Sequence, residues 1–454
     1  MADDYSIAGA SEAQNQLLNE IAASLHVTTP HLSDVANDVY DYVTTGLQQE
    51  TQGPASWVSF ITPSVTQDIR SAIKHESQSL GMTINTQAGR LKISSIKFTS
   101  GQPAAINKQV FYLRKDQVFE DIATRLSEFV NSHELGPGPL PLGVNIDRPI
   151  EETSKLGGRV ADNVDCGPFR SVDIAQALGA VILKKHLPVR VTSVTNCVVS
   201  TLVAAQHRFH NTSVALILNH GINASYYEQA SRIPKLQAKE GRVAVNTELA
   251  RYGEHSAVLA PTRWDHRLDR ESANTGTHTF EKLVADKYLG EIVRNLITDF
   301  MDAQLIFPKN ADASVLGEAY SFFTSYMTIM EDQSGDLREV GDLLRAGFNI
   351  QASVVDRQIV RALCHMVTMR AAKLVGAAVA GIVRRASEPQ AAAAAAAAVV
   401  SISGQLTEMN QPYVACTTGT AQALLLRMGL PAPTFNVLGE DGYTVGAALA
   451  ALSK

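Results

Sequence analysis

Three polar side chains stand in two short segments whose residue types suit the recognition of a small molecule rich in hydroxyl groups. Asn246 and Glu248 lie in VAVNTELA, residues 243–250, and Glu281 lies near the start of FEKLVADKYLGEIVR, residues 280–294. Carboxylates accept hydrogen bonds from paired hydroxyls, and an Asn side chain can both donate and accept. The pattern predicts a polyol-binding site. An equally weighted alternative is that these side chains only join strands and helices to one another.

Strand and helix signals alternate along the chain, and these elements have to position the polar side chains. Residues 1–13 are expected to form a loose tail, followed by a helix over 13–25. A second helix is predicted to begin near Thr29 and Pro30, because Pro suits the first helical position. Strands are predicted next at 81–86, 90–98, 107–113 and 142–146. Helix and strand candidates then alternate at 172–185, 189–195, 196–206 and 213–218. The pattern over residues 279–385 is mainly helical, with a long buried helix predicted at 361–386. This alternation predicts α/β layers.

Length and composition indicate a globular protein of two domains. The 454 residues exceed one ordinary hydrophobic core, and 45% hydrophobic with 19% charged residues is normal for a globular chain. The net charge of −6 argues against a general nucleic-acid or membrane-surface binder, although a local basic patch stays open. No direct nucleic-acid motif is found.

The cysteines and the N-terminal sequence bear on the compartment. The four cysteines are scattered and form neither a metal-binding spacing nor a disulfide framework; they are Cys166, Cys197, Cys364 and Cys416. The polar N-terminus lacks a signal pattern, and no uninterrupted apolar run is long enough to span a bilayer. We expect a cytoplasmic protein, with the nucleus open as a second location, and no membrane insertion.

The eight alanines at 391–398 are expected to be a helix extension or a loop expansion.

Several motifs resemble the hexokinase family over nearly the whole chain. The strongest carriers are VTNCVVSTLVAAQH, LILNHGINASYYEQ, VAVNTELA, DRESANTGTHTFEKLVADKYLGEIVR and EDGYTVGAALAAL. The resemblance implies an α/β fold of two lobes, the actin-like ATPase (ribonuclease H-like) fold. It implies a flexible tail at residues 1–13 and N-terminal helices at 14–73 that pack on the large lobe. The small lobe would comprise residues 74–205, completed by the C-terminal helix at 440–454, and the large lobe residues 206–439.

In hexokinases an N-D-T-x-G-T segment carries the catalytic base, and this chain differs at that position. Asn196 is kept, but Cys197 stands where the family has Asp. A thiol is mostly neutral at pH 7 and accepts hydrogen bonds poorly. Loss of a positioned base typically slows a reaction by about 10²–10⁴-fold. A thiol-based redox sensor at Cys197 is disfavoured, because no His, Lys or resolving cysteine lies close in sequence.

The family's phosphate and nucleotide segments are also altered. The I-D-L-G-G-T-N-L-R loop aligns with residues 84–92, where the Asp is Asn85 and the glycine pair is Gln87 and Ala88. Side chains there would crowd a phosphate, and Asn85 has no charge for a cation. The G-T-G-x-N-G/A-x-Y segment aligns with positions that include Asn219, His220, Gly221 and Asn223. The D-G-S/T-x-Y segment aligns with residues 402–406. The terminal E-D-G-S-G-x-G segment aligns with positions that include Gly442, Tyr443 and Thr444.

Two sugar-contacting loops depart from the family as well. The S-F-P-A-S loop becomes residues 147–151, with Asp147 and Glu151 in place of its serines. The T-K-G-F loop becomes roughly 161–164, with Asp162 inside it. Each lost hydrogen bond in a desolvated pocket costs on the order of 1–3 kcal/mol. The residues that the resemblance leaves for a sugar are Asn196, Asn223, Asn246, Glu248 and Glu281.

These changes predict a hexokinase-like protein without phosphotransfer, acting as a regulatory or sugar-sensing protein of carbon and nutrient metabolism. No metal site and no cofactor are expected. The predicted partners are a weak sugar ligand and regulatory proteins. The alternative is an active kinase for a hexose or an amino sugar, using ATP and magnesium. In that case Asp147, Glu151 or Asp162 would supply the base.

Overall fold

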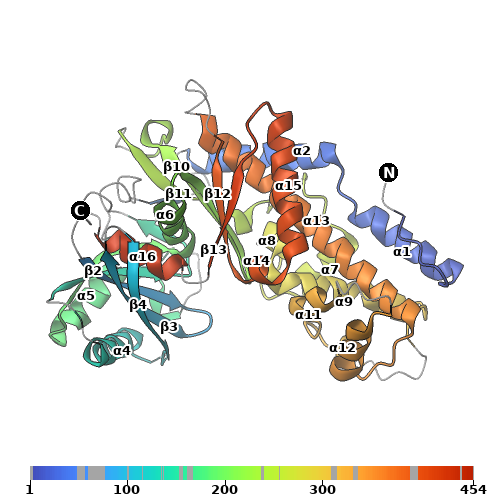
Figure 1. Ribbon diagram of the computed structural model, residues 1–454, viewed down its shortest axis with the longest axis horizontal. Coiled ribbons are helices and arrows are strands. Elements are labelled where there is room, and N and C mark those ends of the chain that lie inside the picture. Colours follow the sequence, from blue (N-terminus) through green and yellow to red (C-terminus); the bar gives the residue numbers. More distant parts are fainter. Residues whose placement is uncertain are drawn as a thin grey trace.

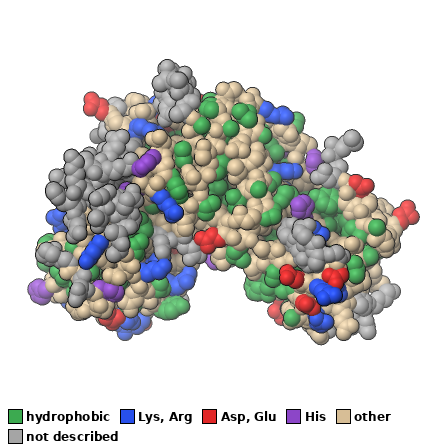
Figure 2. Space-filling model, in the orientation of Figure 1, with side chains coloured by type: hydrophobic (Ala, Val, Ile, Leu, Met, Phe, Trp, Pro, Cys, Tyr) green, Lys and Arg blue, Asp and Glu red, His purple; other side chains and the backbone are tan. Residues whose placement is uncertain are grey.

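Figure 1 shows the computed structural model, in which two α/β lobes stand side by side, and Figure 2 shows a notch between them. The structure describes residues 4–48, 57–59, 77–99, 102–114, 116–133, 135, 138–152, 157–160, 167–236, 240–254, 256–307, 314–330, 336–388, 397–439 and 442–452. The two-lobed actin-like architecture predicted from the sequence is confirmed.

The small lobe is built on a five-stranded mixed sheet in the order β4-β3-β2-β5-β8. Its strands are β2 (Ser77–Asn85), β3 (Arg90–Thr99), β4 (Gln102–Tyr112), β5 (Leu140–Ile146) and β8 (Val189–Asn196). The first three strands are antiparallel, and β5 and β8 run parallel to β2. A short antiparallel pair, β6 (Ile150–Glu152) and β7 (Gly158–Val160), lies beside this sheet. Helices α4 (Val118–Ser132) and α5 (Ile174–Lys184) add to its core.

The large lobe repeats the topology of the small lobe. Its sheet has the order β1-β11-β10-β9-β12-β13. The strands are β1 (Trp57–Ser59), β9 (Thr212–Leu218), β10 (Ile222–Gln229), β11 (Arg242–Asn246), β12 (Val399–Ser403) and β13 (Thr434–Leu438). Strands β9, β10 and β11 are antiparallel, and β12 and β13 extend β9 in parallel. Three antiparallel strands followed by two parallel ones therefore occur in both lobes, although no internal repeat is visible in the sequence.

Helices form most of the large lobe around one long buried helix, α13 (Val354–Ser387). Helix α13 packs against α2 (Thr29–Gly46), α9 (Asp286–Asp302) and α15 (Gln411–Arg427). The other helices described in the two lobes are α1 (Glu12–Leu25), α6 (Cys197–Phe209), α7 (Arg263–Glu271), α8 (Thr279–Val284), α10 (Ser314–Gly317), α11 (Thr324–Met330), α12 (Arg338–Phe348), α14 (Gln405–Met409) and α16 (Gly442–Leu452). Single helical turns lie at Gly167–Phe169, Ala230–Arg232 and Leu249–Arg251.

The predicted elements are largely confirmed, with local differences at their ends. Helix α1 begins at Glu12, and α2 begins at Thr29 with Pro in its first turn. Strand β4 begins at Gln102, five residues before the predicted start at 107. The long helix begins at Val354 instead of 361, because Ser353 and Asp356 form a capping box there. Residues 391–396 of the alanine run lie outside the described residues, and α13 already ends at Ser387.

Helix α13 is also long and apolar enough to cross a membrane by length and composition. However, 89% of its most apolar window is buried inside the protein, as in the core helix of a globular lobe. Buried ion pairs hold this helix in place. Arg370 pairs with Asp265 of α7 through two contacts of 2.7 Å, and Arg385 donates to Glu228 of β10 at 2.8 Å. Such bidentate, charge-assisted pairs fix the register between elements.

Helices α6 and α16 pack tightly against each other at the junction of the lobes. A Cβ atom on Gly446 of α16 would lie 1.8 Å from the carbonyl oxygen of Ser200 in α6. We expect Gly446→Ala to lower the free energy of unfolding by about 1–3 kcal/mol or more, because the backbones must separate. Gly179→Ala is the matched control, because nothing lies within 4 Å of its added methyl. It should stabilise α5 by about 0.5–1 kcal/mol.

Guanidinium denaturation followed by circular dichroism measures both variants. Equal unfolding free energies for Gly446→Ala and the wild-type protein would contradict close contact between α6 and α16.

Candidate functional site

Cys197 lies at the first turn of α6, beside the end of the small-lobe sheet. Asn196 caps this helix, because its side-chain oxygen accepts a hydrogen bond of 2.9 Å from the Val199 N–H. The Cys197 thiol donates to the Ile146 carbonyl at 3.8 Å and accepts from the Asn145 amide at 3.5 Å. The side chain is thus held among protein groups at the end of β5.

The surroundings of Cys197 favour the neutral thiol. Burial, and then the negative charge of Asp147, raise the pKa of Cys197 to about 12. A thiol with this pKa is uncharged at neutral pH and has little capacity to remove a proton from an alcohol. Cys197 is thus a half-buried cysteine with hydrogen-bond partners from β5.

The turn between β2 and β3 carries the three residues aligned with the family's first phosphate loop. The Asn85 side-chain oxygen accepts a hydrogen bond of 2.7 Å from the Ala88 N–H, which closes the turn on itself. Gln87 and Ala88 are exposed. Asp147 supports the same turn, because its Oδ1 accepts from both the N–H and the hydroxyl of Thr86, at 2.9 and 2.8 Å.

The other carboxylates proposed as alternative bases are placed differently. Glu151 in β6 lies 3.4 Å from Arg159 of β7, and this pair is partly exposed. Residues 161–164, with Asp162, lie outside the described residues. Within the described part of the chain, no group of three or more His, Cys, Asp or Glu side chains is arranged to hold a metal ion.

Three of the predicted sugar-binding residues form one hydrogen-bonded network at the start of β10 and the end of β11. The Asn223 amide donates to Asn246 Oδ1 at 2.9 Å and to Glu248 Oε1 at 3.4 Å, and the Asn246 amide donates to Glu248 Oε1 at 2.6 Å. All three side chains hold one another in place, as the structural alternative predicts. Neither bond to Glu248 uses its Oε2, so that oxygen can still accept a hydroxyl hydrogen.

Glu248 is held in an unusual backbone conformation. Its φ is +49°, in the left-handed region that a residue with a side chain seldom adopts. The Tyr42 hydroxyl donates to the Glu248 carbonyl at 2.9 Å, and the Asn246 side chain accepts from the Glu248 N–H at 3.1 Å. Burial raises the pKa of the Glu248 carboxyl. Strained residues of this kind concentrate at binding sites.

Glu281 approaches the network from the first turn of α8. A Cβ on Gly221 would lie 2.6 Å from Glu281 Oε2, so the carboxylate rests against the loop between β9 and β10. His278 Nδ1 lies 3.5 Å from Glu281 Oε1, and His278 is also close enough to Glu248 to influence its carboxyl. His278 therefore lies near both carboxylates, while the Nδ1 atom itself is buried without a hydrogen bond of ordinary geometry.

The loop aligned with the second phosphate loop is tied to two other segments by one side chain. Asn219 Oδ1 accepts from the Gln405 N–H at 2.6 Å, and the Asn219 amide donates to the Tyr443 hydroxyl at 3.1 Å. These bonds connect the β9–β10 loop with the start of α14 and with α16. Gly442 is the buried first residue of α16, next to Tyr443.

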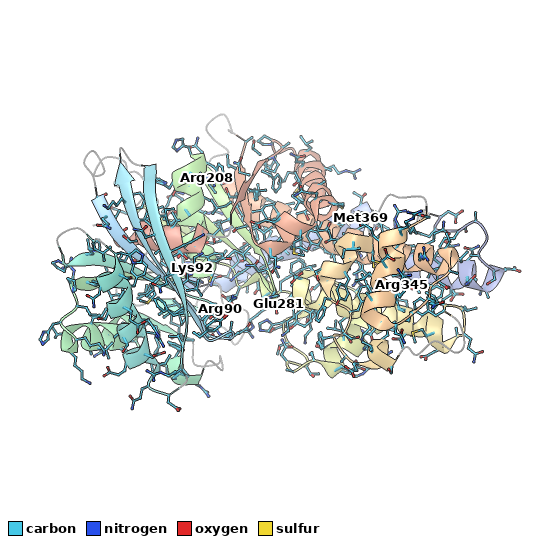
Figure 3. All side chains as sticks on the ribbon, turned by 60° about the horizontal axis from the view of Figure 1, so that its bottom comes forward. Arg90, Lys92, Arg208, Glu281, Arg345 and Met369 are labelled. Carbon is cyan, nitrogen blue, oxygen red and sulfur yellow. The ribbon has the colours of Figure 1, made fainter. Side chains whose placement is uncertain are left out.

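His220, in the loop between β9 and β10, contacts the start of α9 within the large lobe. Its Nδ1 lies 3.1 Å from Asp286 Oδ2 at the start of α9, and its side chain is 75% exposed. The charge of Arg90 in the small lobe also acts on His220. Figure 3 shows Arg90 at the junction of the lobes, near the labelled Glu281. His220 is thus a hydrogen-bonded loop residue.

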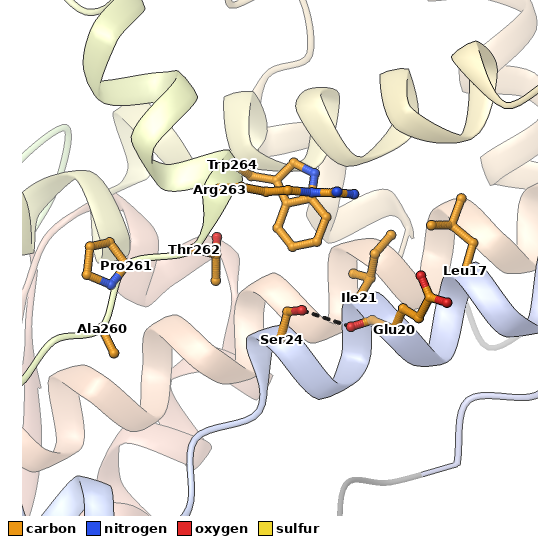
Figure 4. Close-up of a pocket in the computed structure, with 9 residues that line it drawn as sticks. All are labelled: Leu17, Glu20, Ile21, Ser24, Ala260, Pro261, Thr262, Arg263 and Trp264. Atoms are coloured by element: carbon orange, nitrogen blue, oxygen red, sulfur yellow. Dashed lines mark hydrogen bonds between the residues drawn. The ribbon is translucent and has the colours of Figure 1, made fainter.

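A separate pocket lies between α1 and the start of α7, with a volume of about 420 Å³ (Figure 4). It is lined by Leu17, Glu20, Ile21, Ser24, Ala260, Pro261, Thr262, Arg263 and Trp264. The Arg263 guanidinium lies over the Trp264 ring, and both side chains bind Asp299. None of the predicted site residues lines this pocket, so it is not part of the candidate site.

Sequence reasoning missed His278, Tyr42 and Thr86. The spacing of His278 and Glu281, three residues apart, places both on one face of a helical turn, and this signal could have been used. Tyr42 and Thr86 carry no local signal, because each contacts residues far away along the chain. Tyr42 and Glu248, for example, are 206 positions apart.

The His220–Asp286 contact predicts a measurable pH effect. The hydrogen bond to Asp286 raises the pKa of His220 above its ordinary value of about 6.5. Its stabilising effect is fully present below that ordinary value and is lost as the pH rises through the raised pKa. Titration of the His220 ring by NMR should show the raised pKa, and Asp286→Asn should return it toward the ordinary value. An unchanged pKa in this variant would contradict the contact.

Comparison with known proteins places the chain in a family. Two family models, both described as hexokinase, match residues 17–207 and 213–453. Hexokinase from Kluyveromyces lactis is 33% identical over 282 residues, 59% of this chain and 58% of that protein. Hexokinase-2 from Solanum tuberosum is 30% identical over 365 residues, 77% of this chain and 73% of that protein.

The fold agrees with these matches. A Schistosoma mansoni hexokinase complexed with glucose superposes with a TM-score of 0.82 at 22% identity, covering 96% of this chain and 99% of that chain. A second crystal structure of a hexokinase superposes with a TM-score of 0.79 at 19% identity, over 97% of this chain and 100% of that chain. Likeness at this identity shows the fold alone. With both family models covering nearly its whole length, the chain belongs to the hexokinase family.

Proposed function

We propose that this chain is a hexokinase-family protein that does not transfer phosphate and acts as a regulatory or sugar-sensing protein of carbon metabolism. The observation that carries the proposal is the half-buried Cys197 thiol at the position of the family's Asp. Its pKa of about 12 keeps it neutral, and its hydrogen donates to the Ile146 carbonyl. No base therefore stands at that position to accept a hydroxyl proton.

The phosphate-binding side of the cleft supports the same proposal. A kinase cradle needs free backbone N–H groups and a charged ligand for magnesium. Here the Gln405 N–H is bonded to Asn219, the Ala88 N–H is bonded to Asn85, and Asn85 carries no charge. These residues do not fit magnesium–ATP held as the family motif implies, so no step is assigned to that cofactor.

The sugar-binding side is better preserved. Glu248 Oε2 and Glu281 are carboxylate acceptors, and the Asn223–Asn246 pair fixes Glu248. A solved hexokinase of the same fold is complexed with glucose. These observations support a hexose ligand for this chain. Binding without turnover would suit a protein that reports sugar level to protein partners, in the cytoplasm or the nucleus.

We expect no ATP-dependent phosphorylation of glucose, N-acetylglucosamine or glucosamine in a coupled assay, and no rise in melting temperature with magnesium–ATP. A ligand at 100 times its Kd adds about 2.7 kcal/mol to stability, which a thermal scan detects. The variant Cys197→Asp should also stay inactive, because the phosphate loops are altered independently of the base. Turnover in the wild-type protein, or a clear shift with millimolar ATP, would overturn the proposal.

An active kinase is the second candidate, and the position of Asp147 favours it. This carboxylate is close enough to raise the pKa of Cys197, and it is itself half-buried. However, its Oδ1 already accepts two hydrogen bonds from Thr86. If turnover is observed and is lost in Asp147→Asn, with the melting temperature unchanged, then Asp147 is the base and this second candidate is correct.

Glucose binding is expected to depend on Glu281. The wild-type protein should show a rise in melting temperature with glucose, and Glu281→Gln should lose it, because the amide places a donor where a carboxylate accepts hydroxyl hydrogens. The exposed Glu318→Gln is the matched control and should keep the shift. An equal rise in melting temperature with glucose in both variants would exclude Glu281 from the sugar site. No rise in the wild-type protein or in either variant would contradict sugar sensing, but it would leave the proposal that the protein does not transfer phosphate intact.

A further inference from the structure

Among the described residues, strand β4 forms a long outer edge of the small-lobe sheet. In the sheet order it is the outermost strand, and among the described residues it pairs only with β3. It is 11 residues long, whereas strands average about 5–6 residues. Alternate N–H and C=O groups along an edge strand have no ladder partner and can pair with another chain.

The exposed side chains of β4 are partly large and apolar. Ile106, Val110 and Tyr112 are 42%, 53% and 74% exposed, and their even spacing places them on one face. Every side chain from 106 to 110 is exposed. Helix α16 packs on β2, β3, β5 and β8 of the same sheet, so the exposed apolar side chains begin where the helix cover ends. Apolar side chains beside an unpaired edge indicate a protein-binding surface.

The strands around this edge carry only positive charge. From residue 77 to residue 112 there is no Asp or Glu, whereas four positions are basic: Arg90, Lys92, Lys97 and Lys108. The whole chain has a net charge of −6, so this concentration is local. Figure 2 shows Lys and Arg side chains over this part of the small lobe. Cross-strand pairing places Arg90 beside Tyr112 and Lys92 beside Val110, which brings charge and apolar surface together.

We propose that the β4 edge, defined here as Ile106, Lys108, Val110 and Tyr112 with Arg90 and Lys92 of β3, docks an extended acidic segment of a partner protein. The segment would add a sixth strand to the sheet through backbone hydrogen bonds. Its alternate side chains would contact the apolar residues of β4, and its carboxylates would face the basic residues. The surface is independent of the cleft and of whether the chain transfers phosphate.

Charge selects this occupant over the alternatives. A second copy pairing edge to edge would bring together two β4 strands that each carry Lys108 and no acidic residue of their own, and like charges across strands are destabilising. A lysine on an edge strand is a common means of preventing self-association. A nucleic acid would meet a chain of net negative charge and an edge on which two of the three exposed apolar side chains, Ile106 and Val110, are aliphatic.

The test uses the full chain and a fluorescein-labelled nine-residue peptide that alternates Val and Glu. Fluorescence anisotropy at low salt should detect binding, and a peptide that alternates Val and Lys should not bind. The double variant Lys92→Glu/Lys108→Glu should weaken binding by about tenfold or more, because attraction becomes repulsion. Arg338→Glu/Arg427→Glu, at exposed positions of α12 and α15, changes the net charge by the same amount and should leave binding unchanged.

Backbone pairing is tested separately from charge. Two forms of the Val–Glu peptide carry N-methyl groups on one or the other set of alternate residues. Strand addition predicts that one form binds and the other does not, because only one set of N–H groups faces the β4 edge. Tyr112→Ser should weaken binding, and Leu426→Ser, at a 60% exposed position of α15, should not.

Each remaining outcome counts against the proposal. Equal binding of both methylated peptides would exclude strand addition, and no loss in the double lysine variant would exclude charge recognition. Tighter binding of a twelve-residue oligothymidylate than of the acidic peptide would assign the surface to nucleic acid. A dimer in sedimentation experiments that dissociates in the Tyr112→Ser variant would assign it to a second copy of the chain. Circular dichroism melts confirm that each variant is folded.

Discussion

The packing of α16 between the small-lobe sheet and α6 is the contact on which the arrangement of both lobes depends. A Cβ on Gly143 of β5 would lie 1.8 Å from the Ala447 carbonyl, and a Cβ on Gly446 would lie equally close to the Ser200 carbonyl. Backbones therefore touch directly on both sides of the helix. Because α6 starts at Cys197 and α16 starts beside Tyr443, this packing also fixes two segments of the candidate site relative to each other.

The local signals of the sequence predicted most elements, but they could not predict how the strands are ordered. Helices α1 and α2 have clear caps, and the alternation of strands and helices indicated α/β layers. The repeated strand order was invisible because it depends on distant pairing: Val399 of β12 lies beside Thr212 of β9, although almost the whole large lobe separates them in sequence. The family resemblance, and not the pattern of residues, supplied the two-lobed fold.

For the candidate site, too, the residue types could be predicted from the sequence but the contacts between them could not. The residue types at Asn223, Asn246 and Glu248 predicted a polar cluster, and the structure joins them in one network. The sequence could not tell that these side chains bond to one another, because hydrogen-bond partners depend on where β10 begins relative to the end of β11. For these Asn residues, supporting the fold and orienting Glu248 are therefore one function: the bonds that stabilise the strands also hold the Glu248 carboxylate in place.

The altered phosphate loops also explain how the cleft stays stable without a nucleotide. A glycine-rich cradle leaves backbone N–H groups without protein partners, and each such group costs free energy when it is shielded from water. On the proposed function, Asn219 and Asn85 replace the missing phosphate oxygens as acceptors for the Gln405 and Ala88 N–H groups. On that proposal, each substitution would replace a ligand contact with an internal bond, so the fold would gain support where the chemistry is lost. Selection on activity and selection on stability are then separated, and the hydrophobic core can be retained while the cradle changes.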